Sequence, residues 1–148
     1  MQTQTQTQTQ TRFIERTLTE LDHVRLTSLV RNNHRGKATG RHKPSIDDVL
    51  DGSSIVPSRQ VPGDVVTMHS QVLLDDPDVG YTRKITLCYP ADAVPATGMV
   101  SVLSPVGASL LGLKVGDVAR WKTPDGEDHS ATLLEIVYQP EASGNYTM

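Results

Sequence analysis

The residue types that could do chemistry are scattered along this chain and do not form a known catalytic motif. Gly107–Gly112 begins like a phosphate-binding loop, but Leu113 and Lys114 follow where that motif needs Gly-Lys-Ser/Thr. Asp75-Asp76 lies in an expected turn, and no serine has the sequence of a nucleophile elbow. No metal-ligand spacing links the five histidines: His23, His34, His42, His69 and His129. We therefore predict no catalytic residue, no metal site and no cofactor.

Cys88 is the only cysteine, so an intrachain disulfide is excluded and an intracellular location is favoured. Alternation in Ile85–Tyr89 puts Ile85, Leu87 and Tyr89 on one strand face and Cys88 on the other. We interpret this thiol as a small structural residue. The chain starts without a signal-peptide pattern and has no apolar run of bilayer length, so we expect a cytoplasmic protein without membrane contact.

Charge is distributed unevenly along the chain. Residues 1–60 carry nine Lys/Arg against six Asp/Glu, whereas residues 61–148 carry five against eleven. The segment Arg31–Lys43 has five of these cations and no acid, which makes it the basic tip of the N-terminal region: Arg35, Lys37, Arg41 and Lys43. Such a run is either a solvated loop or a contact for DNA, RNA or an acidic protein channel. The asymmetry indicates two surfaces with different partners.

The N-terminal region predicts a tail followed by two helices. Residues 1–16 are mostly Gln and Thr and should be a flexible tail, because they offer little apolar surface to bury. Residues 17–60 predict a short helical hairpin. Thr17-Leu18-Thr19-Glu20 resembles a capping box for a helix that runs to about Val30. Ser45 follows Pro44 as the cap of a second helix, with an apolar stripe made of Ile46, Val49 and Leu50.

Residues 61–148 change to a period of two, which is typical of strands. The expected strands are Val65–Leu74, Tyr81–Tyr89, Met99–Leu103, Val118–Lys122 and Ser130–Tyr138. In the last strand, the expected core-facing residues are Thr132, Leu134, Ile136 and Tyr138. Ser104 and Pro105 are good N-cap and first-turn residues for one helix, which should cover a face of the sheet. The prediction is an α+β domain of five strands and one helix.

The run Val102–Asp117 resembles the signature of the Gre transcription-factor C-terminal domain. Together with Tyr138–Ala142 it is similar, more specifically, to the Rnk group of that family, the regulators of nucleoside diphosphate kinase. Asp64–Met68 and Val94–Trp121 fit the same pattern. The similarity covers about Leu18–Tyr146 and is strongest in its C-terminal part.

This resemblance implies an FKBP-like antiparallel domain behind an N-terminal coiled coil. It also implies docking on the β′ subunit of RNA polymerase, near the secondary channel. The docking loop of Gre factors reads Asp-Ser-Pro, and the matching positions here are Leu103, Ser104 and Pro105, so an apolar side chain replaces one polar contact. The expected docking residues are Leu103, Ser104, Pro105, Val106, Gly107 and Leu110.

Gre factors also carry two acidic residues at a long coiled-coil tip, where they hold a metal ion for transcript cleavage. The hairpin expected here is shorter and its tip is basic, so a cation would be repelled. The resemblance and the basic tip together therefore imply a non-enzymatic, monomeric regulator of transcription elongation that binds RNA polymerase without stimulating cleavage.

Two alternatives remain open. The Rnk resemblance favours regulation of a nucleoside diphosphate kinase, either by direct contact or through transcription. The FKBP-like fold suggests prolyl isomerase activity, but that chemistry needs an aromatic-lined pocket and the chain has six aromatic residues, 4% of its length.

Overall fold

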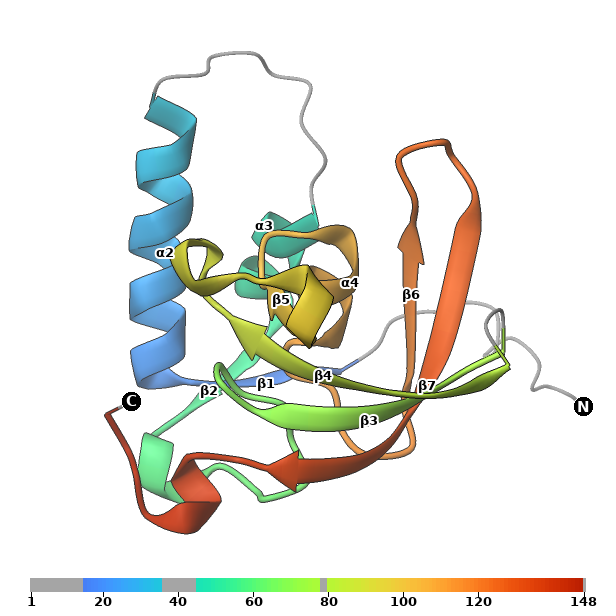
Figure 1. Cartoon of the computed structure of the whole chain (residues 1–148). Coiled ribbons are helices and arrows are strands. Elements are labelled where there is room, and N and C mark those ends of the chain that lie inside the picture. Colours follow the sequence, from blue (N-terminus) through green and yellow to red (C-terminus); the bar gives the residue numbers. More distant parts are fainter. Residues whose placement is uncertain (1–14, 36–44, 78–79, 148) are drawn as a thin grey trace, which may run out of the picture.

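The computed structural model describes residues 15–35, 45–77 and 80–147, which form two sheets with short helices around them (Figure 1). The larger sheet has the strand order β5-β4-β3-β7-β6. Its strands are β3 (Gln71–Asp76), β4 (Tyr81–Cys88), β5 (Met99–Ser101), β6 (Val118–Lys122) and β7 (Asp128–Tyr138). Neighbouring strands are antiparallel except for the parallel pair β4 and β5. The mixed α+β fold expected from the sequence is confirmed.

The smaller sheet is a parallel pair that was not expected, β1 (Thr17–Thr19) and β2 (Ser54–Val56). The helices are α2 (Glu20–Arg35), α3 (Ser45–Gly52) and α4 (Pro105–Leu110). Four 3-10 turns complete the elements: η1 (Ser58–Gln60), η2 (Pro90–Asp92), η3 (Pro95–Thr97) and η4 (Glu141–Ser143). In Figure 1 the large sheet curls around α4, and α2 stands upright beside it. None of the helices in the described ranges is long and apolar enough to cross a bilayer.

The buried core draws on both parts of the sequence. Leu18 and Leu26 from the N-terminal region lie in one cluster with Leu74, Leu110 and Leu133 from the sheet and α4. The division into a tail (1–16), a hairpin (17–60) and a C-terminal domain (61–148) stays a prediction. The core is continuous across the boundary at residue 60, because α2 and α3 bury their apolar faces against the same interior.

The start of α2 differs from its prediction by two residues. Thr17 belongs to β1, and the helix cap is Thr19, whose Oγ1 accepts a hydrogen bond from the backbone N–H of Asp22 at 3.0 Å. The helix also continues past Val30 to Arg35. Arg35 is thus the last helical residue, and the other basic-tip residues, Lys37, Arg41 and Lys43, lie outside the described residues.

The first strand of the large sheet begins later than its alternation predicted. The expected strand Val65–Leu74 is replaced by β3, Gln71–Asp76, so the two aspartates expected in a turn end the strand. Before β3 the chain turns: Ser70 N–H donates to Thr67 O at 3.0 Å, and Ser70 Oγ accepts from Thr67 N–H at 2.9 Å. His69 inside this turn has φ of 71°, which a strand does not allow.

In β7 the predicted core face is wrong for two of its four residues. Ala131 and Leu133 are buried, whereas Leu134 and Tyr138 are 42% and 38% exposed. Of the other two predicted residues, Ile136 packs partly buried against the core.

Two register shifts explain this exchange of faces. Leu74 of β3 lies opposite Leu133 and the adjacent Leu73 lies opposite Glu135, so Leu134 is an extra residue on β7. Val72 lies opposite Ile136 and the adjacent Gln71 lies opposite Tyr138, so Val137 is a second extra residue. The alternation of side chains therefore changes phase at each shift. Counting in steps of two from a single starting residue cannot detect such a change.

Candidate functional site

The loop between β5 and α4 contains the expected docking residues, and hydroxyl groups fix its shape. Ser104 Oγ accepts a hydrogen bond from Gly107 N–H at 3.1 Å and donates one to Ser101 O at 2.7 Å. Ser101 Oγ in turn accepts from Leu103 N–H at 3.0 Å. The predicted N-cap of α4 is therefore confirmed, with Pro105 in the first turn, where its missing N–H leaves no donor unpaired.

Gly107 lies directly against the end of β5. A Cβ atom built on this residue would be 2.0 Å from Ser101 O and 2.9 Å from Ser101 C. Both are backbone atoms, so a side chain could fit only if the helix or the strand moved. The absence of a side chain at this position sets how closely α4 approaches β5.

The six expected docking residues divide by exposure. Pro105 is exposed, and Leu103, Ser104 and Val106 are partly exposed. The other two are buried: Gly107 presses on β5 and Leu110 belongs to the hydrophobic core. A partner could touch the first four side chains directly. Gly107 and Leu110 lie beneath these four residues and support the loop.

Arg16 forms hydrogen bonds with the C-terminal end of α4, a contact that the sequence did not predict. Its Nη1 donates to Leu111 O at 2.8 Å and to Ser109 O at 3.1 Å, so it satisfies carbonyls at the helix end. Burial lowers the pKa of Arg16, against the opposite effect of the Asp117 carboxylate. Sequence reasoning placed Arg16 at the end of a flexible tail, because no local pattern connects it with a helix more than ninety residues away.

A second polar cluster lies where α2 meets the turn before β3. Asp22 is only 3% exposed, and its Oδ2 accepts a hydrogen bond from Met68 N–H at 3.1 Å. Burial raises the pKa of Asp22 to about 6. Hydrogen bonds from Met68 and Thr19 oppose this rise, and the charge of nearby Glu141 adds to it. A carboxylate therefore joins α2 to the turn before β3 at an energetic cost.

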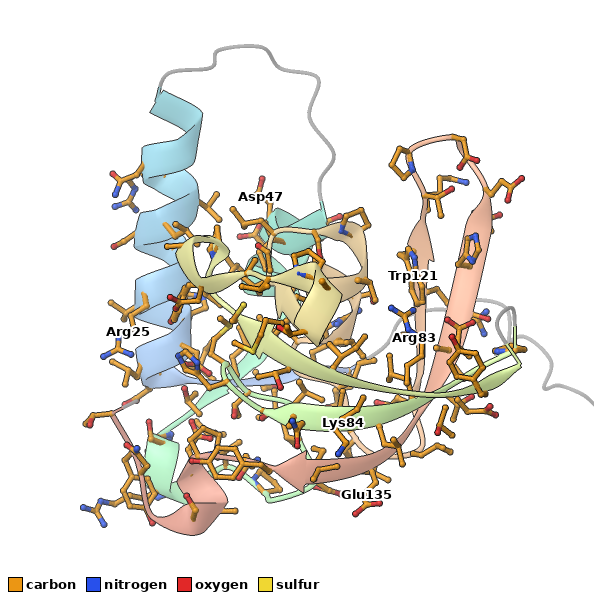
Figure 2. The ribbon with its side chains drawn as sticks, viewed as in Figure 1. Arg25, Asp47, Arg83, Lys84, Trp121 and Glu135 are labelled. Atoms are coloured by element: carbon orange, nitrogen blue, oxygen red, sulfur yellow. The ribbon has the colours of Figure 1, made fainter. Side chains whose placement is uncertain are left out.

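The surroundings of Asp22 come from elements distant in sequence. Thr67 Oγ1 donates to Glu141 Oε1 at 2.7 Å, which ties the turn before β3 to η4. The His69 ring meets the Tyr89 ring edge-on, with 5.6 Å between the centroids. Burial lowers the pKa of His69. In Figure 2 Arg25 extends from the same end of α2 toward the C-terminal segment, and its Nη2 donates to Thr147 O at 3.3 Å.

A groove of about 340 Å³ lies between α2 and α3, on other elements than the loop before α4. His23 Nε2 donates to Leu50 O at 3.2 Å beside it. Asp47, which Figure 2 labels above α3, is on its wall. Its lining residues are His23, Thr27, Val30, Arg31, Asp47, Leu50 and Asp51. In the described ranges no three His, Cys, Asp or Glu side chains come together as a metal site.

Comparison with known proteins decides the family. The family described as "Transcription elongation factor, GreA/GreB, C-term" matches residues 61–138. The chain belongs to this family. It is 42% identical over 99 residues to the "Regulator of nucleoside diphosphate kinase" of Escherichia coli (strain K12), covering 67% of this chain and 73% of that protein.

Two further relatives agree with this assignment. "Transcription elongation factor GreA" of Clostridium acetobutylicum is 31% identical over 83 residues, covering 56% of this chain and 52% of that protein. The solved structure of a "Prokaryotic transcription elongation factor GreA/GreB from Nitrosomonas europaea" is 30% identical, with a TM-score of 0.66. This match covers 83% of the chain and 99% of the solved chain. The loop before α4 lies inside the family match, whereas Arg16 and Asp22 precede it.

Proposed function

We propose that this chain is a non-enzymatic transcription regulator of the Gre/Rnk type that binds RNA polymerase through Leu103–Val106. The observation that carries the proposal is the position of this loop: it lies inside the family match, at the surface, and is held rigid by Ser101 and Ser104. A rigid loop loses little conformational entropy on binding. Pro105, the exposed residue of the loop, is its first contact with the partner.

The proposed binding site on the polymerase is the β′ subunit near the secondary channel, as the Gre resemblance implies. In this proposal the regulator acts there as a cytoplasmic monomer with an FKBP-like C-terminal domain, which the Gre resemblance also implies. Leu103 stands where Gre factors have an aspartate. The contact made by this position is therefore apolar, and the affinity should depend less on salt there than a carboxylate contact would.

The same proposal excludes stimulation of transcript cleavage. The segment Arg31–Lys43 carries five cations and no carboxylate that could hold a metal ion. With 16 residues, α2 is only about 24 Å long. The basic tip (Arg35, Lys37, Arg41 and Lys43) instead contacts phosphates or acidic side chains and makes the affinity salt-dependent.

Binding of the full chain to core RNA polymerase tests the docking loop. Pro105→Asp should reduce the affinity, and a melting curve of the variant separates lost contact from unfolding. A Gre factor added in excess should displace the chain. Unchanged affinity of a folded Pro105→Asp variant, or simultaneous binding of both factors without loss of affinity, would rule out this site.

A cleavage assay on backtracked elongation complexes tests the second part. The wild-type chain should leave the transcript intact, whereas a Gre factor in the same assay shortens it. Robust cleavage by the chain alone would contradict the proposal. Neutralising the four basic-tip residues together should flatten the dependence of affinity on salt, measured at two ionic strengths.

One observation favours a second candidate function. The relative that shares 42% identity over 99 residues is described as a regulator of nucleoside diphosphate kinase. Purified nucleoside diphosphate kinase should then change its rate when the chain is added, without polymerase present. An unchanged rate over a range of chain concentrations would exclude direct regulation.

A further inference from the structure

A long stretch of this chain is almost free of charge. Between Ile85 and Leu113 the only charged residue is Asp92, although 21% of the whole chain is charged. Part of the stretch is buried in β4, at Val102 and in α4, where an uncharged sequence is expected. The remainder lies at the surface, where charge is the rule. Depletion of charge on an exposed surface is characteristic of the centre of a protein interface.

The exposed part of this stretch is the connection between β4 and β5. Pro90, Ala91 and the segment Val94–Thr97 are exposed, and Val94 alone keeps 48% of its surface accessible. A single exposed valine needs no explanation. Here, however, prolines, alanines and a valine follow one another in an exposed segment in which Asp92 is the one charged residue, so the segment presents little charge along its length.

Backbone contacts place this connection beside the docking loop. Val94 pairs with Met99 at the start of β5, through Val94 N–H to Met99 O at 2.9 Å and Met99 N–H to Val94 O at 3.2 Å. At the other end of β5, Val102 N–H donates to Cys88 O at 2.9 Å. This bond brings η2 next to the residue before Leu103. The connection therefore runs along β5, the edge strand of the sheet, from the end of β5 near the docking loop back to the start of the strand.

We propose that the polymerase-docking surface continues from Leu103–Val106 along the edge of β5 to Val94 and Pro95. This inference rests on the proposed function and adds that the partner presents an uncharged, apolar strip to this side of the loop. The surface is defined here as the β5-edge band: Pro90, Ala91, Val94, Pro95, Leu103 and Pro105. A charge placed within such a contact is desolvated without a partner, which lowers affinity strongly.

The test compares two valines of similar exposure. Val94→Asp should weaken binding of the full chain to core RNA polymerase by about tenfold or more, because an unpaired charge in an interface costs at least the equivalent of one decade in Kd. Val137→Asp is the matched control: Val137 is 44% exposed, on β7, three strands away from β5. It should change the affinity less than about twofold. Val94→Leu, which keeps the surface apolar, should bind like the wild type.

Each outcome separates this inference from the proposed function. Suppose that Pro105→Asp loses affinity and a folded Val94→Asp variant binds like the wild type. The proposal of the β5-edge band is then wrong, and the docking loop is still supported. Equal losses in Val94→Asp and Val137→Asp overturn it as well, since the effect would then follow net charge. If Pro105→Asp and Val94→Asp each bind like the wild type, the proposed function and the β5-edge band are both wrong. If these two variants lose affinity and Val137→Asp does not, both proposals are supported.

Discussion

The first turns of α2 and α4 use the same cap and differ three residues later. Thr19 and Ser104 each accept a hydrogen bond from the backbone N–H of the third helical residue. In α4 that residue is Gly107, which has no side chain and lies against Ser101 O. In α2 it is Asp22, a buried carboxylate that reaches Met68 N–H.

This difference shows what each junction requires. At the start of α4 the helix backbone approaches the backbone of β5 closely. This junction therefore depends on the volume of the side chain at position 107 and involves no ionisable group. The α2 junction uses a carboxylate whose pKa is raised by burial, so it depends on pH. Two helices with identical caps should therefore respond to different perturbations.

The largest effect is expected from Gly107→Ala. The added Cβ would lie 2.0 Å from Ser101 O, so α4 or β5 must shift, at a cost of about 3 kcal/mol or more in the free energy of unfolding. Gly52→Ala is the control, because no atom lies within 4 Å of a Cβ there. That control should be neutral or slightly stabilising in a urea titration. If the two variants were equally stable, β5 would be able to shift away from α4 at little cost in free energy, and the prediction would be wrong.

The next effect concerns pH and Asp22. The folded pKa of about 6 exceeds the ordinary value of 3.8, so between these pH values the folded state keeps a proton that the unfolded state has released. The contribution of Asp22 is therefore full below about pH 4 and is lost as the pH rises through 6. The loss is on the order of 3 kcal/mol. Urea unfolding of wild type and Asp22→Asn across this range should give curves that diverge by this amount, whereas parallel curves would contradict the prediction.

A smaller effect distinguishes the two caps. Ser104→Ala and Thr19→Ala should each reduce the free energy of unfolding by about 1 kcal/mol. Only Thr19→Ala should also alter the pH dependence, because the hydrogen bond from Thr19 helps to lower the pKa of Asp22. Repeating the urea titrations at two pH values separates the variants. An equal pH response in both would mean that Thr19 does not influence Asp22.

The smallest effect is expected away from both helices. Lys122 Nζ lies 2.7 Å from Asp128 Oδ1, but both side chains are largely exposed. Exposed pairs gain little because water screens them. Asp128→Asn should leave the melting temperature unchanged within error. A clear decrease would show that the β6–β7 hairpin depends on this pair more than its exposure indicates.

Local signals allowed part of this structure to be predicted. Ser104 and Pro105 mark the start of α4 within four residues of sequence, and the structure has the same cap. Other features depend on contacts between distant segments. The bulge at Leu134, the pairing of β1 with β2 and the burial of Asp22 are set by partners elsewhere in the chain. No period or cap motif within a few residues encodes them.

The proposed docking loop shows the same division. The family pattern predicted contacts at Leu103–Val106, Gly107 and Leu110, and the structure has Gly107 and Leu110 buried beneath the surface. Whether a residue in such a run is a contact or a support depends on what packs behind it. Ser101 was not foreseen either, because a serine at the end of a short strand has no signal of its own.

The hydrogen bonds of Arg16 and Arg25 have a consequence for the order of folding. Arg16 reaches a carbonyl 95 residues further along the chain, and Arg25 reaches one 122 residues further. While the ribosome is still producing β7, Arg25 of α2 lacks this partner, because Thr147 follows that strand in the chain. Sequence separations of this size give a high contact order, which slows folding. The N-terminal helix can therefore complete its contacts only after Thr147 has left the exit tunnel.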